Sequence, residues 1–459
     1  MLRTPFPMNG PLITMTHVCQ LWRNVLLSTP DLWTQIDFSL PPSPQQVEHF
    51  LRLSKKLPID IHHSLEHLDD VEPFLSTTLL NTSRLRRLDI RSHLPRFERL
   101  LGYFSASAPA LESLNINNDF SFTQRTMEFP NNIFGGHLPK LTKLSLHHLQ
   151  TDLRGFSAPA LTWFSLVTNA SISVQNLASF FERCPLLEFI HLRSHFTPEP
   201  PDLPPKKRVC LTALKELRLD DAACTLLDHL ILPKCVKMTL NGQFTTRDFG
   251  GHGDPAARIH PSSIDHLPVM RGIAKAVVMP RSCILSGPNG YLRFCTPQEN
   301  CDNFNAELFT LSPITTSGIR KLWVGAAAIR AFRKETAACI RGVFEVLTKV
   351  EDLTILSCKT ELIFAALGTK LGDAVLPGLQ RLTIYVGYGD LDIAALVQCA
   401  KTRKENSRSL REVAITFENE PGADVIQEVE PLREFVERLI RHVGVSPVLK
   451  LEGEDCGIW

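Results

Sequence analysis

The residues that could do chemistry in this chain form no recognisable catalytic motif. The sequence holds no Gly-x-Ser-x-Gly elbow, no Gly-x-x-x-x-Gly-Lys phosphate loop and no His-Glu-x-x-His helix. These motifs would position a nucleophile, a phosphate group or a zinc ion. Their absence argues against the hydrolase, nucleotide-dependent and metalloprotease classes. We therefore expect no catalytic residues and a protein that is not an enzyme.

Histidines and cysteines gather most closely in one Gly- and Pro-rich stretch. They are His252, His260, His266, Cys283, Cys295 and Cys301. Paired zinc ligands lie about two to five residues apart, and these spacings do not match. The adjacent pairs His62-His63 and His147-His148 would point to opposite faces of a strand, which makes them poor joint ligands. The sequence favours no metal site and no cofactor.

Two charged runs have both a functional and a simpler interpretation. Asp220-Asp221 follows a predicted strand and could bind a cation or a basic peptide. Pro204-Pro205-Lys206-Lys207-Arg208 could be read by a nuclear import receptor. In both places a solvated loop is the simpler interpretation.

The composition is that of an ordinary globular protein. The 459 residues carry a net charge of +1, from 49 basic and 48 acidic residues, which does not indicate nucleic acid or a membrane surface as the main partner. There is neither an apolar run of membrane-spanning length nor an apolar secretory segment at the start. The 12 cysteines form no Cys-x-x-Cys pair, and we expect Cys184, Cys339, Cys358 and Cys399 to be buried free thiols. We expect the protein in the cytoplasm or the nucleus.

A repeated pattern of the form L-x-x-L-x-L, with related apolar residues in the L positions, organises most of the chain. It begins at Leu85, Leu111, Leu141, Leu161, Leu187, Leu214, Cys235, Ile319, Val350, Leu379 and Leu410. Apart from one interval of 84 residues, successive starts lie 20 to 31 residues apart. Leucine-rich repeats recur about every 20–29 residues. The pattern predicts an α/β leucine-rich-repeat solenoid, with an open parallel sheet from Leu85 to Ile415 and helices on its outer face.

Within each predicted strand the apolar positions should point inward and the others toward solvent. The solvent-facing row is polar and mixed in sign, and suits a protein or peptide partner better than a polyanion. Its members are Arg86, Arg87, Asp89, Glu112, Ser113, Asn115, Thr142, Lys143, Ser145, Lys215, Glu216, Arg218, Gln380, Arg381 and Thr383.

Helical periodicity appears between the predicted strands. Apolar residues share one helical face within 97–104, 174–184, 332–347 and 425–443, the last a helix of nearly five turns that Pro431 could interrupt. Residues 1–15 look irregular. Residues 243–318 break the repeat, with candidate strands at 273–278 and 291–294, and we expect degenerate repeats with looped insertions there.

The segment Thr16 to Phe38 precedes the repeats. Val18, Leu21, Trp22, Val25 and Leu26 fall on one face of a helix. Pro30 pushes Thr29 out of the helical region and so ends the helix. Apolar residues after this turn indicate entry into a strand.

This segment resembles the second half of an F-box, in the form found in F-box-like proteins of mushroom-forming fungi. The matching residues are Ile13 to Arg23 and Leu27 to Trp33, and the Cys184-Pro185-Leu186-Leu187-Glu188 junction resembles the repeats of such proteins. The Leu-Pro-x-Glu helix that opens an F-box is missing. The resemblance implies that a Skp-type adaptor of a cullin–RING ubiquitin ligase binds here, through Val18, Cys19, Leu21, Trp22, Leu32 and Trp33.

The sequence therefore predicts a partial F-box-like segment at 1–40 and an irregular leucine-rich-repeat domain at 41–459. The predicted function is that of a non-catalytic scaffold, the substrate-recognition subunit of a Skp–cullin–F-box ubiquitin ligase with an unknown protein substrate. The alternative is a leucine-rich-repeat binding module with no adaptor or ubiquitin role.

Adaptor binding is expected to be weak or absent. Trp22 and Trp33 should both bury inward, since each can bury about 200 Å². That would leave less than the roughly 800 Å² that a specific interface buries on each partner. A longer form with an upstream Leu-Pro-x-Glu helix would then bind more tightly.

Overall fold

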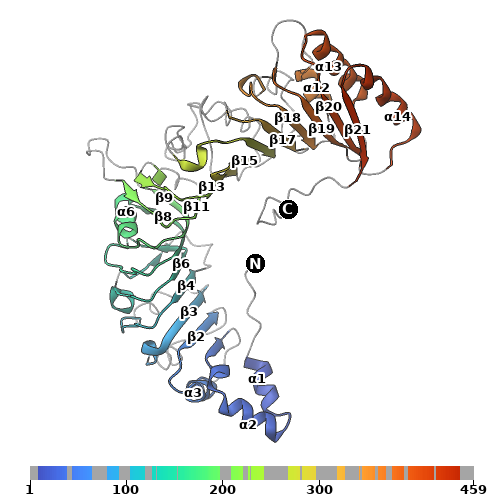
Figure 1. The fold of residues 1–459 in the computed structure, drawn as a ribbon. Helices are drawn as coiled ribbons and strands as arrows, with labels where there is room; N and C mark the ends of the chain where they lie inside the picture. Colours follow the sequence, from blue (N-terminus) through green and yellow to red (C-terminus); the bar gives the residue numbers. More distant parts are fainter. Residues whose placement is uncertain are drawn as a thin grey trace. The chain divides into compact units, whose positions relative to one another are not determined.

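The computed structural model describes residues 9–38, 44–64, 80–92, 104–118, 127–130, 132–151, 153–196, 208–220, 226–227, 229–241, 267–279, 282–295, 318–325, 341, 344–356, 360–367, 375–386, 391–417 and 420–444 (Figure 1). The chain divides into two compact units, Met1–Cys235 and Val236–Trp459. Each is an α/β unit built on a sheet whose strands run mostly in parallel.

The sheet of the first unit is parallel throughout its described part. Its strands pair in the order of the sequence. They are β1 (Gln35–Phe38), β2 (Ile59–Ser64), β3 (Leu85–Ser92), β4 (Ser113–Asn118), β6 (Lys143–His147), β8 (Trp163–Ile172), β9 (Phe189–Phe196) and β11 (Glu216–Asp220). Two short parallel pairs accompany them, β5 (Met127–Glu128) with β7 (Leu149–Gln150) and β10 (Val209–Cys210) with β12 (Leu230–Ile231).

The register of this sheet follows the repeated apolar pattern. Successive partners along the fourth position of the pattern are Leu88, Leu114, Leu144, Phe164, Ile190 and Leu217, and all are buried. A slip by one residue would turn every one of these side chains to solvent, so burial of one face holds the register. Each of the eleven predicted segments of the whole chain contains a strand, and its first residue is buried.

Tight turns lead into several strands. The amide of Leu111 bonds the carbonyl of Ala108, and Leu161 and Leu187 make the same bond to Ala158 and Cys184. A proline stands second in each of these turns. Its fixed φ of about −65° suits that position, which explains the Pro before these strands.

Helices and 3₁₀ turns connect the strands. In the first unit they are α1 (Asn9–Thr16), α2 (Gln20–Ser28), η1 (Pro30–Trp33), α3 (Pro44–Leu53), η2 (Thr82–Arg84), η3 (Ile133–Gly136) and α6 (Val174–Glu182). The predicted helix at 174–184 is confirmed, with Phe180 and Phe181 buried against Phe164. The predicted helices at 97–104 and 332–347 fall mainly outside the described residues.

The sheet of the second unit contains one reversed strand. Its described strands are β13 (Lys237–Asn241), β14 (Lys275–Met279), β15 (Ser282–Gly287), β16 (Gly290–Cys295), β17 (Lys321–Gly325), β18 (Asp352–Leu356), β19 (Arg381–Val386), β20 (Glu412–Phe417) and β21 (Arg438–Val443). The pairing order is β13, β16, β15, β14, β17 and then the rest in sequence, with only β15 antiparallel among these.

This meander corrects the prediction of degenerate repeats within 243–318. The candidate strands at 273–278 and 291–294 are β14 and β16, but β15 between them was not predicted. Pairing therefore leaves sequence order here, because β13 bonds β16 and not β14. The sequence Gly287-Pro288-Asn289-Gly290 forms a hairpin, which only an antiparallel pair can use.

The second unit also carries η6 (Pro268–Met270), α12 (Glu361–Leu367), α13 (Ile393–Glu405), α14 (Ala423–Val429) and η8 (Glu430–Glu434). The long helix predicted for 425–443 is wrong. It ends as α14, passes through η8 at Pro431 and becomes β21. Proline cannot continue the helical hydrogen bonds, and the edge of β20 offers the following residues a parallel partner.

No helix in the described part of the chain is long and apolar enough to cross a membrane.

Candidate functional site

Two helices and a turn form the N-terminal end of the first unit. The Sγ of Cys19 accepts a hydrogen bond from the amide of Trp22 at 3.5 Å and so caps the start of α2. Arg23 donates from Nε to the carbonyl of Thr16 at 2.8 Å, which ties α2 to the end of α1. The prediction that residues 1–15 are irregular is wrong for the described residues, because Asn9–Thr16 is helical.

Trp33 anchors this end to the rest of the unit. Its side chain is buried, with 1% exposed. The indole Nε1 donates to the carbonyl of Leu26 at 2.8 Å, and the ring packs on Phe50 of α3 at 5.3 Å between centroids. The inward orientation predicted for Trp33 is confirmed. The Leu26 carbonyl also accepts from the amide of Thr29 at 3.2 Å, so the indole supplies its second donor at the end of α2.

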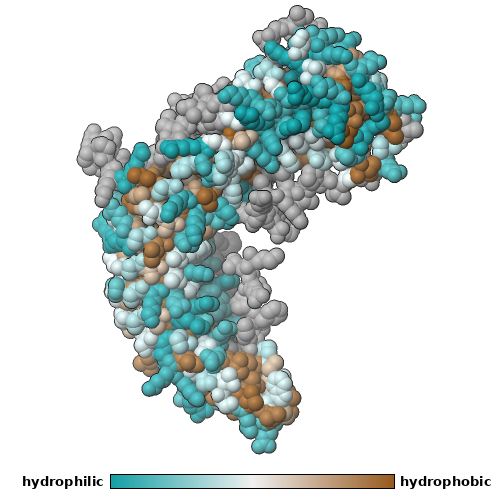
Figure 2. Space-filling view, in the orientation of Figure 1, coloured by the Kyte–Doolittle hydropathy of each residue, from teal (hydrophilic) through white to brown (hydrophobic). Residues whose placement is uncertain are grey.

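The apolar residues of α2 other than Leu26, and those of the turns on either side of it, are exposed. Leu21 is 71% exposed and Trp22 50%, and the other exposed apolar residues here are Met15, Val18, Val25, Leu27 and Leu32. Figure 2 shows hydrophobic side chains gathered at the α1–α2 end of the molecule. We call Val18, Leu21, Trp22, Val25 and Leu32 the α2 apolar face. Exposed apolar side chains gathered in this way make the face a candidate interaction site.

The α2 apolar face corrects the expectation that Trp22 buries inward. Only Leu26 of α2 is buried, so the helix is held through Leu26 and through Trp33. The six residues that resemble an adaptor-binding site divide accordingly. Val18, Cys19, Leu21, Trp22 and Leu32 are exposed, and Trp33 supports them from inside. The argument for weak adaptor binding therefore loses the part that rests on burial of Trp22, and the strength of adaptor binding stays a prediction.

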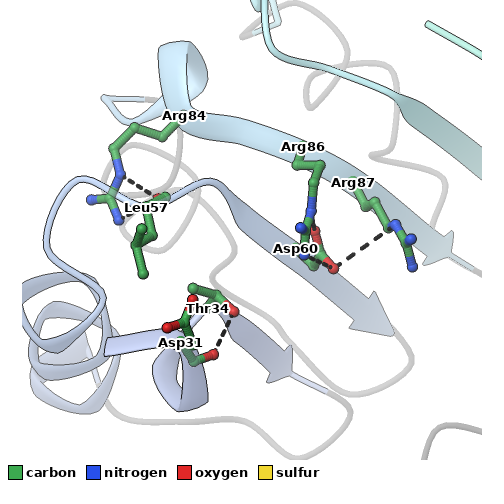
Figure 3. A network of polar contacts seen from close by, with 7 residues as sticks. All are labelled: Asp31, Thr34, Leu57, Asp60, Arg84, Arg86 and Arg87. Carbon is green, nitrogen blue, oxygen red and sulfur yellow. Dashed lines mark hydrogen bonds and ion pairs between the residues drawn. The ribbon is translucent and has the colours of Figure 1, made fainter. Parts of the chain in front are cut away.

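A polar network joins this end to the strands that follow (Figure 3). The amide of Asp60 donates to the carbonyl of Thr34 at 2.8 Å, and the Thr34 hydroxyl donates to the carbonyl of Asp31. Arg86 donates two hydrogen bonds to the carboxylate of Asp60, at 2.7 and 2.9 Å. The hydrogen bonds and charge of Asp60 raise the pKa of the Arg86 guanidinium. The N-terminal turn is thus fixed to the sheet by directed bonds.

The predicted solvent-facing row of the sheet lies on the surface. Of its fifteen residues, Ser145 alone is buried. Neighbouring strands pair charges along it, as Arg381 with Asp352 and Lys215 with Glu188. Such exposed cross-strand pairs contribute modestly to stability.

Aromatic side chains on this surface were not predicted. Trp163 and Phe189 are register partners and stack with ring centroids 5.2 Å apart and planes 3° apart. The guanidinium of Arg218 lies 5.7 Å from the Phe189 centroid. The signal was present, because Trp163 and Phe189 both stand third in their repeats, where other strands carry polar residues.

Beside the aromatic pair lies a polar series that could be mistaken for a catalytic triad. The Oγ of Ser165 is 3.2 Å from Nδ1 of His191, and Nε2 of His191 is 3.3 Å from Oδ2 of Asp220. Ser165 is buried and lies within parallel pairing on both sides. Acyl transfer needs an accessible nucleophile and free amides for an oxyanion, and the described backbone here does not offer them. The arrangement is a cross-strand hydrogen-bond ladder.

The other candidates for chemistry divide between described and undescribed residues. His62 is half-buried and His63 is buried, as alternation predicts, whereas His148 leaves the strand with a φ of +58°. Cys184 and Cys399 are buried free thiols as predicted. The described residues contain no group of three metal-ligating side chains. His252, His260, His266, Cys301, Cys339, Cys358, Asp221 and most of the basic run at 204–208 lie outside them.

The fold defines a class: an α/β protein with a mostly parallel sheet. No family model matches the chain, and a comparison with curated proteins finds no match.

Proposed function

We propose that this protein is an F-box-like leucine-rich-repeat protein and serves as the substrate-recognition subunit of a Skp–cullin–F-box ubiquitin ligase. The α2 apolar face would hold the Skp-type adaptor, and the solvent-facing side of the sheet would select a protein substrate. The ubiquitin chemistry would belong to other subunits, so the protein itself is a scaffold and not an enzyme. Its compartment would be the cytoplasm or the nucleus.

The observation that carries this proposal is the difference in burial between Trp33 and Trp22. Trp33 is buried and holds the segment, while Trp22 and Leu21 point outward from the same short stretch. An isolated monomer gains nothing from exposing these side chains, since burying each would stabilise it by about 1.5–3 kcal/mol. A partner that covers the face would recover this free energy. Tryptophan is also enriched among the residues that dominate binding energy.

The repeat assignment is supported by the register of the sheet. Apolar positions align from strand to strand over β3, β4, β6, β8, β9 and β11, with about one repeat between partners. Leucine-rich repeats use this arrangement to form an extended binding face. The meander at β14, β15 and β16 is a departure that the repeat pattern does not explain.

The test is the affinity of the purified full chain for a purified Skp-type adaptor. We expect binding by the unchanged chain and a loss of at least about tenfold in the Leu21→Glu and Trp22→Glu variants, as for residues at the centre of an interface. Leu186→Glu is the matched control, because Leu186 is equally apolar and exposed but lies before β9. Failure of the unchanged chain to bind, or equal loss in the control, would reject the adaptor role.

The alternative function is a leucine-rich-repeat binding module without an adaptor. The aromatic pair Trp163 and Phe189 favours a binding role for the sheet that does not depend on α2. If the adaptor does not bind while partners of the sheet do, this alternative holds.

A further inference from the structure

In the stacked pair Trp163 and Phe189, one face of the Trp163 ring is not part of the stack. One face of the Trp163 ring is covered by Phe189, and Phe189 in turn lies under the guanidinium of Arg218. Arg218 is held in place by Glu216, with Nη2 2.7 Å from Oε1. Because the stack is parallel and runs across the strands, the remaining face of Trp163 is turned toward β6. There its register partner is Lys143.

Basic groups predominate around this ring surface. Glu188, directly before β9, pairs with Lys215, and Glu112 lies directly before β4. The solvent-facing positions of β6, β8 and β9 carry the cations Lys143 and Arg193 and the imidazoles His147 and His191, and they carry no carboxylate. The carboxylates on the next strand are engaged, Glu216 by Arg218 and Asp220 by His191. Lys143 is exposed and forms no ion pair with any residue that the structure describes. This differs from the row around β2 and β3, where Asp60 and Asp89 balance the cations.

A polypeptide fits this surface better than a nucleic acid does. Single-stranded nucleic acid binds platforms on which several bases stack in turn. Here Trp163 offers the one ring face of the stack that no ring or guanidinium of the described residues covers. The net charge of the chain is also only +1. One ring face of Trp163 beside the ammonium group of Lys143 matches a single aromatic side chain with a neighbouring carboxylate.

We propose that the face of β6, β8 and β9 binds a segment of a partner protein in which an aromatic residue is flanked by acidic residues. The aromatic side chain packs on the open face of Trp163, and a carboxylate pairs with the ammonium group of Lys143. This inference rests on the proposed function, in which the sheet selects the substrate, and it names the chemistry of the segment selected.

The test measures binding of the full chain to three immobilised synthetic peptides of equal length. The first has one Phe flanked by Asp and Glu, the second has the same Phe flanked by Lys, and the third has the acidic residues with Ala in place of Phe. We expect tightest binding to the first peptide. Lys143→Glu and Trp163→Ala should each weaken it on the order of tenfold, the effect of losing a central interface contact.

Lys140→Glu is the charge-matched control, since Lys140 is equally exposed but lies in the turn before β6. It should leave binding unchanged. Lys143→Glu alters an exposed side chain only, so it tests the proposal even if Trp163→Ala fails to fold. Equal or absent binding of the three peptides, or unchanged binding by Lys143→Glu, would overturn the proposal, as would tighter binding of a single-stranded oligouridylate.

Adaptor binding measured on the same samples separates this inference from the proposed function. If the peptide preference holds while the adaptor does not bind, only the adaptor role is lost. If the adaptor binds through Leu21 and Trp22 while the peptides are not distinguished, only this inference is lost.

Discussion

Arg403 of α13 donates from Nη2 to the carbonyl oxygen of Leu376 at 2.9 Å, across a sequence separation of 27 residues. Leu376 has a φ of +49°, a left-handed conformation that is strained for a leucine. Arg183 makes the same contact to Leu153, whose φ is +53°, at 2.8 Å. In both places the leucine lies in a turn before a strand, and the arginine that binds its carbonyl lies about one repeat further along the chain.

Replacing Arg403 should therefore destabilise the second unit. Arg403 is buried, burial lowers the pKa of its guanidinium, and Val375 and Leu376 both accept from it. Arg403→Met removes the side-chain donor of the Val375 carbonyl and leaves the Leu376 carbonyl only the amide of Leu379, at a cost of about 1–3 kcal/mol. Thermal unfolding should show a clear fall in Tm, whereas Lys401→Met, an exposed change on the same helix, should not. Similar values for both variants would contradict the role given to Arg403.

Phe181 and Glu182 are neighbours on α6 with opposite environments. Phe181 is buried against Phe164 and Phe180, and Glu182 is exposed. Phe181→Ala should cost about 3–5 kcal/mol in the free energy of unfolding, because the cavity cannot close fully. Glu182→Ala should change it by less than about 0.5 kcal/mol. Denaturant unfolding of the two variants measures both free energies. Equal effects would refute the assignment of Phe181 to the buried face of α6 and Glu182 to the exposed one.

Gly290 should tolerate no side chain. Its φ is +121°, and a Cβ there would collide with the backbone carbonyl of Val236, the residue directly before β13. Gly290→Ala should lower stability by more than about 2 kcal/mol, since both the backbone conformation and the pairing of β13 with β16 are disturbed. Gly422→Ala is the control, because a Cβ at Gly422 meets nothing within 4 Å. A Tm that falls equally in both variants, or in neither, would show that the close approach does not matter.

The described cysteines should differ in their reactivity. Burial raises the pKa of Cys184 to about 12 and that of Cys399 to about 11, and Cys19 and Cys210 are exposed. Alkylation at pH 8, followed by peptide mass spectrometry, should modify Cys19 and Cys210 rapidly and the two buried thiols only after unfolding.

The same two thiols predict a loss of stability in alkali. Below pH 9, the ordinary value for the unfolded chain, they are neutral in both states. Above it the unfolded state releases protons that the folded state keeps, so stability falls as the pH rises toward 11–12. A Cys184→Ser, Cys399→Ser variant should lose part of this alkaline dependence. An unchanged pH profile would argue that other groups cause it.

The sequence by itself determined where the strands of the repeated pattern lie and which side chains they bury. The reason is that buried and exposed side chains must alternate along a strand with one buried face. The spacing of Leu187, Ile190 and Leu192 therefore predicts both β9 and the face that it buries. The turns before Leu111, Leu161 and Leu187 could also be predicted from the sequence, because the proline ring in each fixes its own φ. The N-terminal helix pattern from Val18 to Leu26 was local in the same way.

Tertiary structure alone decided which face of that helix is covered. Trp22 and Trp33 look equally suited to a core, and only the position of Phe50 and of the Leu26 carbonyl turns Trp33 inward and leaves Trp22 outside. The reversed strand β15 and the edge strand β21 depend on the free strand edges beside them, which lie far away in sequence. The stack of Trp163, Phe189 and Arg218 likewise exists only because parallel pairing brings residues 26 and 29 positions apart to one place on the sheet, and no local pattern records that distance.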